Sequence, residues 1–178
     1  FVLKYRMPNK HKEVPLDDAQ QAIRYIREHA NEFGVDTNKV GIAGFSAGGH
    51  LAASLSTLAA DANRPDFAIL YYPVISFDNM TTHGGSKKNL LGTDIENKEL
   101  VDRYSLQKQV DDKTPKTLLL LSDDDQTVPA AMLDFFNSTE DMKEAFDPFY
   151  TATSLNKATD VNVLHEIKAS LDEVGVYE

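Results

Sequence analysis

The chain has 178 residues, of which 18 are Lys or Arg and 28 are Asp or Glu, so its formal net charge is −10. This charge argues against nonspecific binding to nucleic acid, which needs a basic surface. Hydrophobic residues make up 42% and charged residues 26% of the chain, a composition typical of soluble globular proteins rather than of disordered ones.

The sequence lacks a membrane-spanning apolar run and lacks cysteine, and both absences exclude classes of protein. No apolar run approaches the roughly 18 residues that cross a bilayer, and the longest candidate is Thr117–Leu121. The chain has no cysteine, which excludes disulfides, zinc thiolate sites and thiol nucleophiles. We expect a soluble protein, cytoplasmic or exported, with any signal segment outside this chain, because the sequence begins at Phe1 within a strand-like run.

Strand-like patterns recur along the chain. The apolar runs Val40–Phe45, Phe67–Val74 and Thr117–Ser122 lack polar alternation and predict strands buried on both faces. Phe1–Tyr5 is also β-prone and predicts a strand that leaves into a loop.

Helical patterns fill the gaps between these runs. After Pro15, apolar residues step by three or four as far as Gly34, a residue that suits a helix end. A small-residue helix is expected from residue 47 to about residue 60, and another over 161–174, before a last strand that begins at Val176. The alternation predicts the α/β class, with a mostly parallel sheet and helices on both faces.

The organisation predicted is one domain over residues 1–178. Residues 75–116 are polar, and we expect them to form an insertion over the strand ends, with a short helix near 99–106. The sequence shows no internal repeat and no linker that would divide it.

The most specific motif is Gly44-Phe45-Ser46-Ala47-Gly48, a G-x-S-x-G pattern between a predicted strand and a predicted helix. In a nucleophile elbow the serine lies on a strained turn, and small neighbours are needed because backbones approach closely, a need that Gly44 and Gly48 meet. The Ala47 amide, at the helix start, is expected to donate to a developing oxyanion. The alternatives are a serine-capped turn and a phosphate loop, although the lysine of a phosphate loop is absent.

A serine nucleophile needs a histidine base and a carboxylate that orients this base. Asp123, Asp124 and Asp125 follow the predicted strand Thr117–Leu121, at the carboxyl end where α/β sheets keep their sites. One of them is the predicted acid. A solvated acidic loop and a calcium-binding cluster are the alternatives for these aspartates.

Four stretches carry a resemblance to a known family. They occur in the order VPLDDAQQAIRYIREHANEFGVDTNKVGIAGFSAGGHLAASLST, RPDFAILYYPVISF, TTHGGSKKNLLG and SDDDQTVP. Over roughly residues 1–129 the chain resembles the esterase branch of the α/β-hydrolase fold, especially bacterial acetyl-xylan-esterase-like and carbohydrate-ester hydrolases. The resemblance implies an α/β-hydrolase fold with Ser46 as nucleophile. It also implies Asp125 as the acid, because Asp125 begins the D-x-x-V-P run.

The resemblance further implies two segments without a counterpart in this sequence. They are a glycine-rich oxyanion loop upstream and a G-G-H-G type turn that carries the histidine. We therefore expect a partial domain, with both segments outside the chain. Of the five histidines, His165 alone follows Asp125, so His165 is a possible base, but it neighbours Leu164 and Ile167 in a helical pattern that favours a structural role. The favoured expectation is therefore a histidine beyond Glu178. His50 is expected to pack and to form hydrogen bonds instead.

These residues predict a serine carboxylesterase that removes acetyl or other short acyl groups from carbohydrates such as acetylated xylan, with no metal and no organic cofactor. The expected partner is a small-molecule or carbohydrate ester, and neither nucleic acid nor a membrane. Two alternatives stay open: a peptidase or amidase on the same fold, and a catalytically silent hydrolase-like binding module or fragment. An unpaired sheet edge near Phe1–Tyr5 makes a homodimer a further hypothesis.

Overall fold

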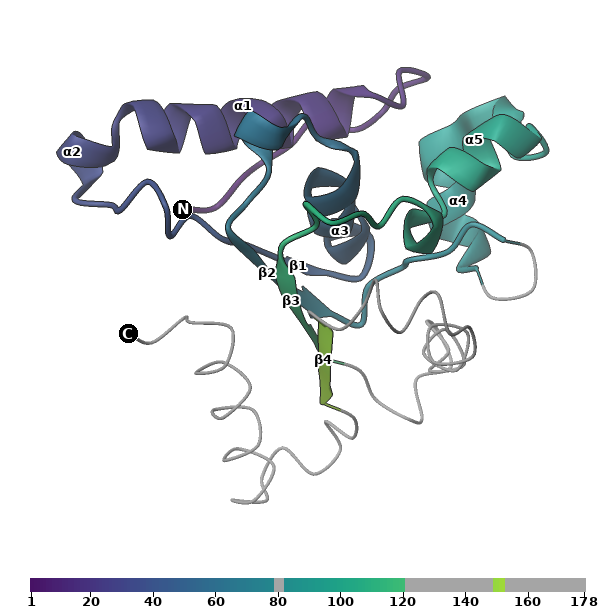
Figure 1. Cartoon of the computed structure of the whole chain (residues 1–178). Helices are drawn as coiled ribbons and strands as arrows, with labels where there is room; N and C mark the ends of the chain where they lie inside the picture. The colour runs from purple at the N-terminus through teal and green to yellow at the C-terminus, as the bar shows by residue number, and fades with distance from the viewer. Residues whose placement is uncertain (79–81, 121–148, 153–178) are drawn as a thin grey trace, which may run out of the picture.

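The computed structural model describes residues 1–78 and 82–120 and the backbone of residues 149–152. At its centre is a sheet of four parallel strands in the order β1-β2-β3-β4 (Figure 1). The strands are β1 (Ile42–Phe45), β2 (Phe67–Tyr71), β3 (Lys116–Leu120) and β4 (Phe149–Ala152). The predicted α/β class and parallel sheet are confirmed.

The strand register brings the carboxyl ends of all four strands to one edge. Phe45 pairs with Tyr71, Tyr71 pairs with Leu120, and Leu120 pairs with Ala152. The carboxyl ends of β1 and β3 therefore lie at the same edge of the sheet, with the end of β2 between them. Sites in open parallel sheets form at this edge.

Helix α3 (Ser46–Leu58) packs on β1 and β2 (Figure 1) and is buried along most of its length. Its small residues bring the helix close to the sheet, but three of its buried side chains carry hydroxyls. Ser54, Ser56 and Thr57 each donate to the carbonyl oxygen four residues earlier, at 2.8–2.9 Å. The helix backbone thus satisfies its own buried polar side chains.

Helix α1 (Val14–Glu28) packs mainly against α3. The apolar residues of its buried face recur at helical spacing: Pro15, Leu16, Ala19 and Ile23. They pack against Leu51 and Leu55 of α3. The short helix α2 (Ala30–Phe33) follows and ends at Gly34, whose φ of 65° is the left-handed conformation that the sequence predicts there.

The described residues of the connection between β2 and β3 form two α-helices and two 3-10 turns. They are α4 (Gly84–Leu91), η2 (Gly92–Asp94), α5 (Lys98–Arg103) and η3 (Leu106–Lys108). Helix α5 confirms the helix predicted near 99–106, whereas α4 was not predicted. Phe77 and Leu106 of this connection join the core formed by Leu70 and α3. None of the helices in the described ranges is both long and apolar enough to cross a bilayer.

The prediction of a strand at Phe1–Tyr5 is wrong, because the structure gives these residues no regular secondary structure. No strand in the described ranges pairs with them, and a β-prone sequence without a pairing partner forms no ladder. Side chains fix the segment instead. The Phe1 ring packs edge-on against Phe33 at 5.0 Å between centroids, and Arg6 forms hydrogen bonds with Asp18 from its backbone and its guanidinium.

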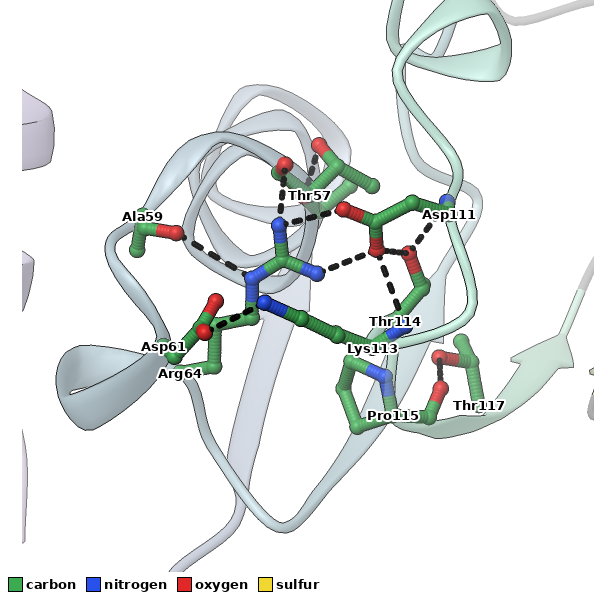
Figure 2. A network of polar contacts seen from close by, with 10 residues as sticks. Thr57, Ala59, Asp61, Arg64, Asp111, Lys113, Thr114, Pro115 and Thr117 are labelled. Carbon is green, nitrogen blue, oxygen red and sulfur yellow. Dashed lines mark hydrogen bonds and ion pairs between the residues drawn. The ribbon is translucent and has the colours of Figure 1, made fainter.

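Arg64 connects the end of α3 to the segment before β3 (Figure 2). Its guanidinium donates to the carbonyl oxygens of Thr57 and Ala59, each at 3.1 Å, which belong to the last turn of α3 and the residue after it. Two guanidinium nitrogens also bind the Asp111 carboxylate, at 2.5 and 2.8 Å. The Arg64 side chain is only 10% exposed. It therefore satisfies helix-end carbonyls while it positions the chain entering β3.

Replacing Arg64 with methionine is expected to lower the free energy of unfolding by about 2–3 kcal/mol, because three acceptors lose a charged donor in a half-buried place. Lys113→Met is the matched control. Lys113 binds Asp61 nearby, but both side chains are more than half exposed, so its loss is expected to cost less than about 0.5 kcal/mol. Urea unfolding of both variants measures the difference, and equal losses would contradict the assigned role of Arg64.

Candidate active site

Ser46 is the first residue of α3 and directly follows β1, at the carboxyl edge of the sheet. Figure 1 shows these two elements. Its φ of 50° is in the left-handed region, which costs a non-glycine residue about 1–3 kcal/mol. Val74, after β2, holds the turn by donating its N–H to the Ser46 carbonyl oxygen at 3.3 Å. The structure thus confirms the strained strand-to-helix turn, and the nucleophilic role of Ser46 stays a prediction.

Gly44 has no room for a side chain. A β-carbon there would overlap the carbonyl oxygen of Gly48 and lie 2.6 Å from its carbonyl carbon. Both atoms belong to the backbone of α3, so they cannot move aside as a flexible side chain could. The close approach of β1 and α3 at this point therefore depends on glycine, as predicted.

Gly48 differs from this prediction, because a β-carbon there would meet no atom of the described residues within 4 Å. Gly48 contributes its backbone to the close approach, and its own side-chain position is open. The second restricted position is Gly49, where a β-carbon would lie 2.8 Å from Cβ of Pro73. The G-x-S-x-G pattern contains Gly48 but not Gly49. Gly49 is nevertheless the glycine of α3 that lies against the loop after β2.

Ala47 is exposed and lies in the first turn of α3. The residue before the helix, Phe45, provides no side-chain hydrogen bond to the first turn. Within the part of the chain that the structure describes, the first amides of the helix therefore have no side-chain cap, at its positive end. This placement agrees with an oxyanion-binding amide at Ala47, a role that stays a prediction.

The predicted acid and base, Asp125 and His165, lie outside the described residues, as does the last strand expected at Val176. The structure does define where the chain toward Asp125 starts. Leu120 ends β3 in register with Tyr71, which in turn pairs with Phe45, the residue before Ser46. Asp125 is five residues further along the chain than Leu120.

His50 is a packing residue with a hydrogen bond, as predicted. Its ring is 6% exposed and stacks on Phe77 with 4.5 Å between ring centroids. Nδ1 donates to the Val74 carbonyl oxygen at 2.7 Å. Burial lowers the pKa of His50 to about 4, because a charged imidazolium would lose its hydration there. His50 is therefore neutral near pH 7.

Two further histidines have local structural partners. His83 precedes α4, and its ring accepts a hydrogen bond from the Ser86 N–H at 3.2 Å, so it caps that helix. The ring of His29 lies 2.9 Å from the Tyr25 carbonyl oxygen, between α1 and α2. Each of these rings thus bonds to a residue of its own segment.

We expect the stability of the fold to fall as the pH decreases from about 6.5 to about 4. The unfolded chain binds a proton on His50 below pH 6.5, whereas the folded chain resists protonation down to about pH 4. The loss totals about 3 kcal/mol, since each pKa unit is worth about 1.4 kcal/mol. Unfolding free energies measured in urea between pH 7 and pH 4 test this.

A His50→Gln variant is the control, because it has no group that titrates in this window at this position. Its pH slope is expected to be shallower than that of the wild type. Asp111 does not affect this comparison of pH slopes. The Arg64 guanidinium lowers the pKa of Asp111 to about 2, so the stability that Asp111 contributes is lost only below about pH 4. Identical slopes in variant and wild type would contradict the assignment to His50.

Sequence reasoning missed a cluster of aromatic residues beside Ser46. The rings of Phe45 and Tyr71 stack at 4.4 Å, and Tyr72 lies 6.0 Å from Phe45. Tyr72 follows the last residue of β2, and its φ of 35° ends the extended backbone of the strand. Its N–H still donates to the Leu120 carbonyl oxygen of β3 at 2.7 Å. The pair of tyrosines before Pro73 is the sequence signal, but it gives no hint of the left-handed residue.

Comparison with known proteins shows the family. The BD-FAE family pattern matches residues 1–139. The chain belongs to the BD-FAE family. Among solved structures, the BD-FAE chain is similar to an acetyl ester-xyloside bifunctional hydrolase from Caldicellulosiruptor lactoaceticus. That structure has a TM-score of 0.74 and 37% identity, and the match covers 86% of this chain and 60% of that one. Its structural relatives are esterases of the α/β-hydrolase fold, which is therefore the fold of this chain.

Two curated relatives are also similar in sequence. An acetylxylan esterase of Xylanibacter ruminicola is 40% identical over 131 residues, which cover 72% of this chain and 27% of that protein. Endo-1,4-beta-xylanase B of Butyrivibrio fibrisolvens is 38% identical over 130 residues, which cover 67% of this chain and 20% of that protein. The BD-FAE chain thus spans about a quarter or less of the length of these relatives.

Proposed function

We propose that this BD-FAE chain carries the core of a serine esterase that removes acetyl or other short acyl groups from carbohydrate esters. The observation that carries the proposal is the left-handed Ser46 at the turn from β1 to α3, in a chain of this family. The similarity to an acetylxylan esterase and to an acetyl ester-xyloside hydrolase supports acetyl as the acyl group and a carbohydrate as the alcohol part of the substrate.

In the proposed reaction Ser46 Oγ attacks the ester carbonyl carbon and forms an acyl-enzyme, and the alcohol leaves with a proton from a histidine. The Ala47 N–H donates to the oxyanion. Asp125 orients the histidine, which is His165 or a residue outside this chain. Water then attacks the acyl group, the carboxylic acid leaves, and Ser46 regains its proton. No step needs a metal or an organic cofactor.

Matched substrates separate this function from its alternatives. We expect the chain to hydrolyse p-nitrophenyl acetate much faster than p-nitroacetanilide, the corresponding amide, and to release acetate from acetylated xylan. Faster hydrolysis of the amide would favour a peptidase or amidase on the same fold. Hydrolysis of none of the three substrates would favour a binding module without catalysis.

A further inference from the structure

Three aromatic rings, those of Phe45, Tyr71 and Tyr72, gather at the carboxyl edge of the sheet. Phe45 ends β1 and Tyr71 ends β2, and the two residues are partners in the strand register. Their rings stack at 4.4 Å between centroids, with only 14° between the ring planes. The Tyr72 ring lies 6.0 Å from that of Phe45. We call these three rings the aromatic platform.

The platform is open to solvent. Phe45 is 54% exposed and Tyr72 is 36% exposed. Tyr71 covers one face of the Phe45 ring, and because Tyr71 belongs to β2, the opposite face is turned away from β2. Within the described ranges β1 pairs with β2 alone, so no described strand lies on that side. A ligand can therefore reach the second face of the Phe45 ring.

The platform is joined to Ser46 on two sides. Phe45 directly precedes Ser46, so their α-carbons are about 3.8 Å apart. Val74, two residues after Tyr72, donates its N–H to the Ser46 carbonyl oxygen at 3.3 Å. Ser46 and Tyr72 both have positive φ, at 50° and 35°. Such strain in residues other than glycine clusters at functional sites, so both turns point to a ligand at this edge.

The exposed area of the platform fits a small ligand rather than a protein partner. An aromatic side chain offers roughly 150–250 Å² in all, so the exposed parts of Phe45 and Tyr72 come to roughly 130–230 Å². A stable protein interface takes about 800 Å² from each partner. The platform is well below this size, and it suits a ligand with one or two rings.

We propose that a sugar ring in the alcohol part of the ester stacks on the open face of Phe45, with Tyr72 as a second contact. The inference rests on the proposed function and deepens it by naming the residues that recognise the carbohydrate. The face of an aromatic ring is electron-rich and attracts the weakly positive C–H groups of a sugar. In β-xylose every hydroxyl is equatorial, so both faces of its ring present C–H groups. Stacking on Tyr71 holds the Phe45 ring in place before the sugar binds.

Carbon NMR of the phenylalanine rings tests binding without turnover. The protein is the Ser46→Ala variant with ¹³C-labelled phenylalanine, and the Phe45 signal is identified by its absence when Phe45→Leu is added. The probes are xylotetraose and xylitol, an open-chain alcohol that has hydroxyls but no ring faces. Xylotetraose is expected to shift the Phe45 resonances to a plateau, and xylitol is expected to leave them in place. Unmoved resonances, or equal shifts with both probes, would overturn the proposal.

Kinetics with two esters give a readout that a purely structural effect would not move. Phe45→Leu keeps an apolar side chain in β1 but removes the aromatic face. We expect it to raise KM for a methyl β-D-xyloside monoacetate roughly three- to tenfold more than KM for ethyl acetate, which has no sugar. Equal changes in KM for both esters would contradict the proposal.

Tyr25→Leu is the matched control. Tyr25 lies on α1, is also 54% exposed, and also stacks on a neighbouring ring, that of His29, at 4.1 Å. Its replacement is expected to leave the ratio of the two KM values within about twofold of the wild type, as for an ordinary surface substitution. An effect on this ratio as large as that of Phe45→Leu would contradict a role particular to the platform.

Light scattering tests a different occupant, a second copy of this chain. We expect a monomer. A dimer that Phe45→Asp dissociates would show that a second copy covers the rings, and would overturn the proposal.

The two proposals can fail separately. Xylotetraose binding at Phe45 without hydrolysis of any ester by the wild type would contradict the proposed function and leave the platform assignment in place. Ester hydrolysis that depends on Ser46, with no shift of the Phe45 resonances, would overturn the platform assignment alone.

Discussion

Ser46→Ala is expected to lower the rate of p-nitrophenyl acetate hydrolysis by a factor of at least about 10³–10⁴. Alanine removes the atom that forms the acyl-enzyme, and such losses in serine hydrolases are of this size or larger. The backbone of the turn is unaffected, because alanine tolerates φ near 50° no better and no worse than serine. Initial rates of the variant, corrected for the rate in buffer, measure the effect.

Ser56→Ala is the matched control for this substitution. Ser56 lies on the same helix, and its hydroxyl donates to the Ala52 carbonyl oxygen at 2.9 Å, away from the turn. This variant is expected to keep its esterase rate within about twofold, since one hydrogen bond inside a helix contributes only about 1 kcal/mol to stability. Similar rates in Ser46→Ala and the wild type would contradict the role of Ser46.

Gly44→Ala is expected to have the largest effect on stability, a loss of about 3 kcal/mol or more. The added methyl group would overlap the Gly48 carbonyl and force β1 and α3 apart, in a place where both partners are backbone. Movement of α3 would also displace Ser46 and the first amides of the helix. Urea unfolding gives the loss in stability, and the esterase rate of the folded fraction gives the effect on the turn.

Gly48→Ala separates this overlap from a general requirement for glycine in the motif. The position is open in the structure, and alanine is a better helix former than glycine by about 1 kcal/mol. The variant is therefore expected to be at least as stable as the wild type. A loss as large as that of Gly44→Ala would show that the two glycines are equivalent, contrary to the structure.

The elements with strong local signals could be predicted from the sequence. An uninterrupted apolar run indicates a buried strand, so β1 and β2 lie within the predicted ranges and β3 begins one residue before its range, at Lys116. Gly34 ends its helix as expected. The G-x-S-x-G pattern lies between a strand and a helix, and this context is enough to predict the turn at Ser46.

The features that were missed depend on contacts rather than on local pattern. Phe1–Tyr5 has the composition of a strand but no neighbour to pair with in the described ranges, and composition cannot show this. Helix α4 begins with two glycines, which argue against a helix, yet His83 caps it. The hydrogen bond from His50 Nδ1 to Val74 and the contact between Gly49 and Pro73 likewise exist only in three dimensions.

The candidate site divides in the same way. Ser46 and Ala47 could be predicted because the elbow is continuous in sequence. Choosing the acid requires knowing where β3 ends in the sheet, which the sequence does not give. Without the family resemblance, the sequence does not separate Asp125 from its two acidic neighbours. The base is harder, because histidine positions in this fold are defined by tertiary structure rather than by spacing.

Mass spectrometry of the chain after treatment with a fluorophosphonate tests most directly whether Ser46 is an activated nucleophile. The reagent forms a stable bond with the oxygen of such a serine and leaves ordinary serines unmodified. We predict one adduct per chain, located on the peptide that contains Ser46 and absent from Ser46→Ala. An unmodified wild-type chain, or an adduct that persists in the variant, would contradict the account.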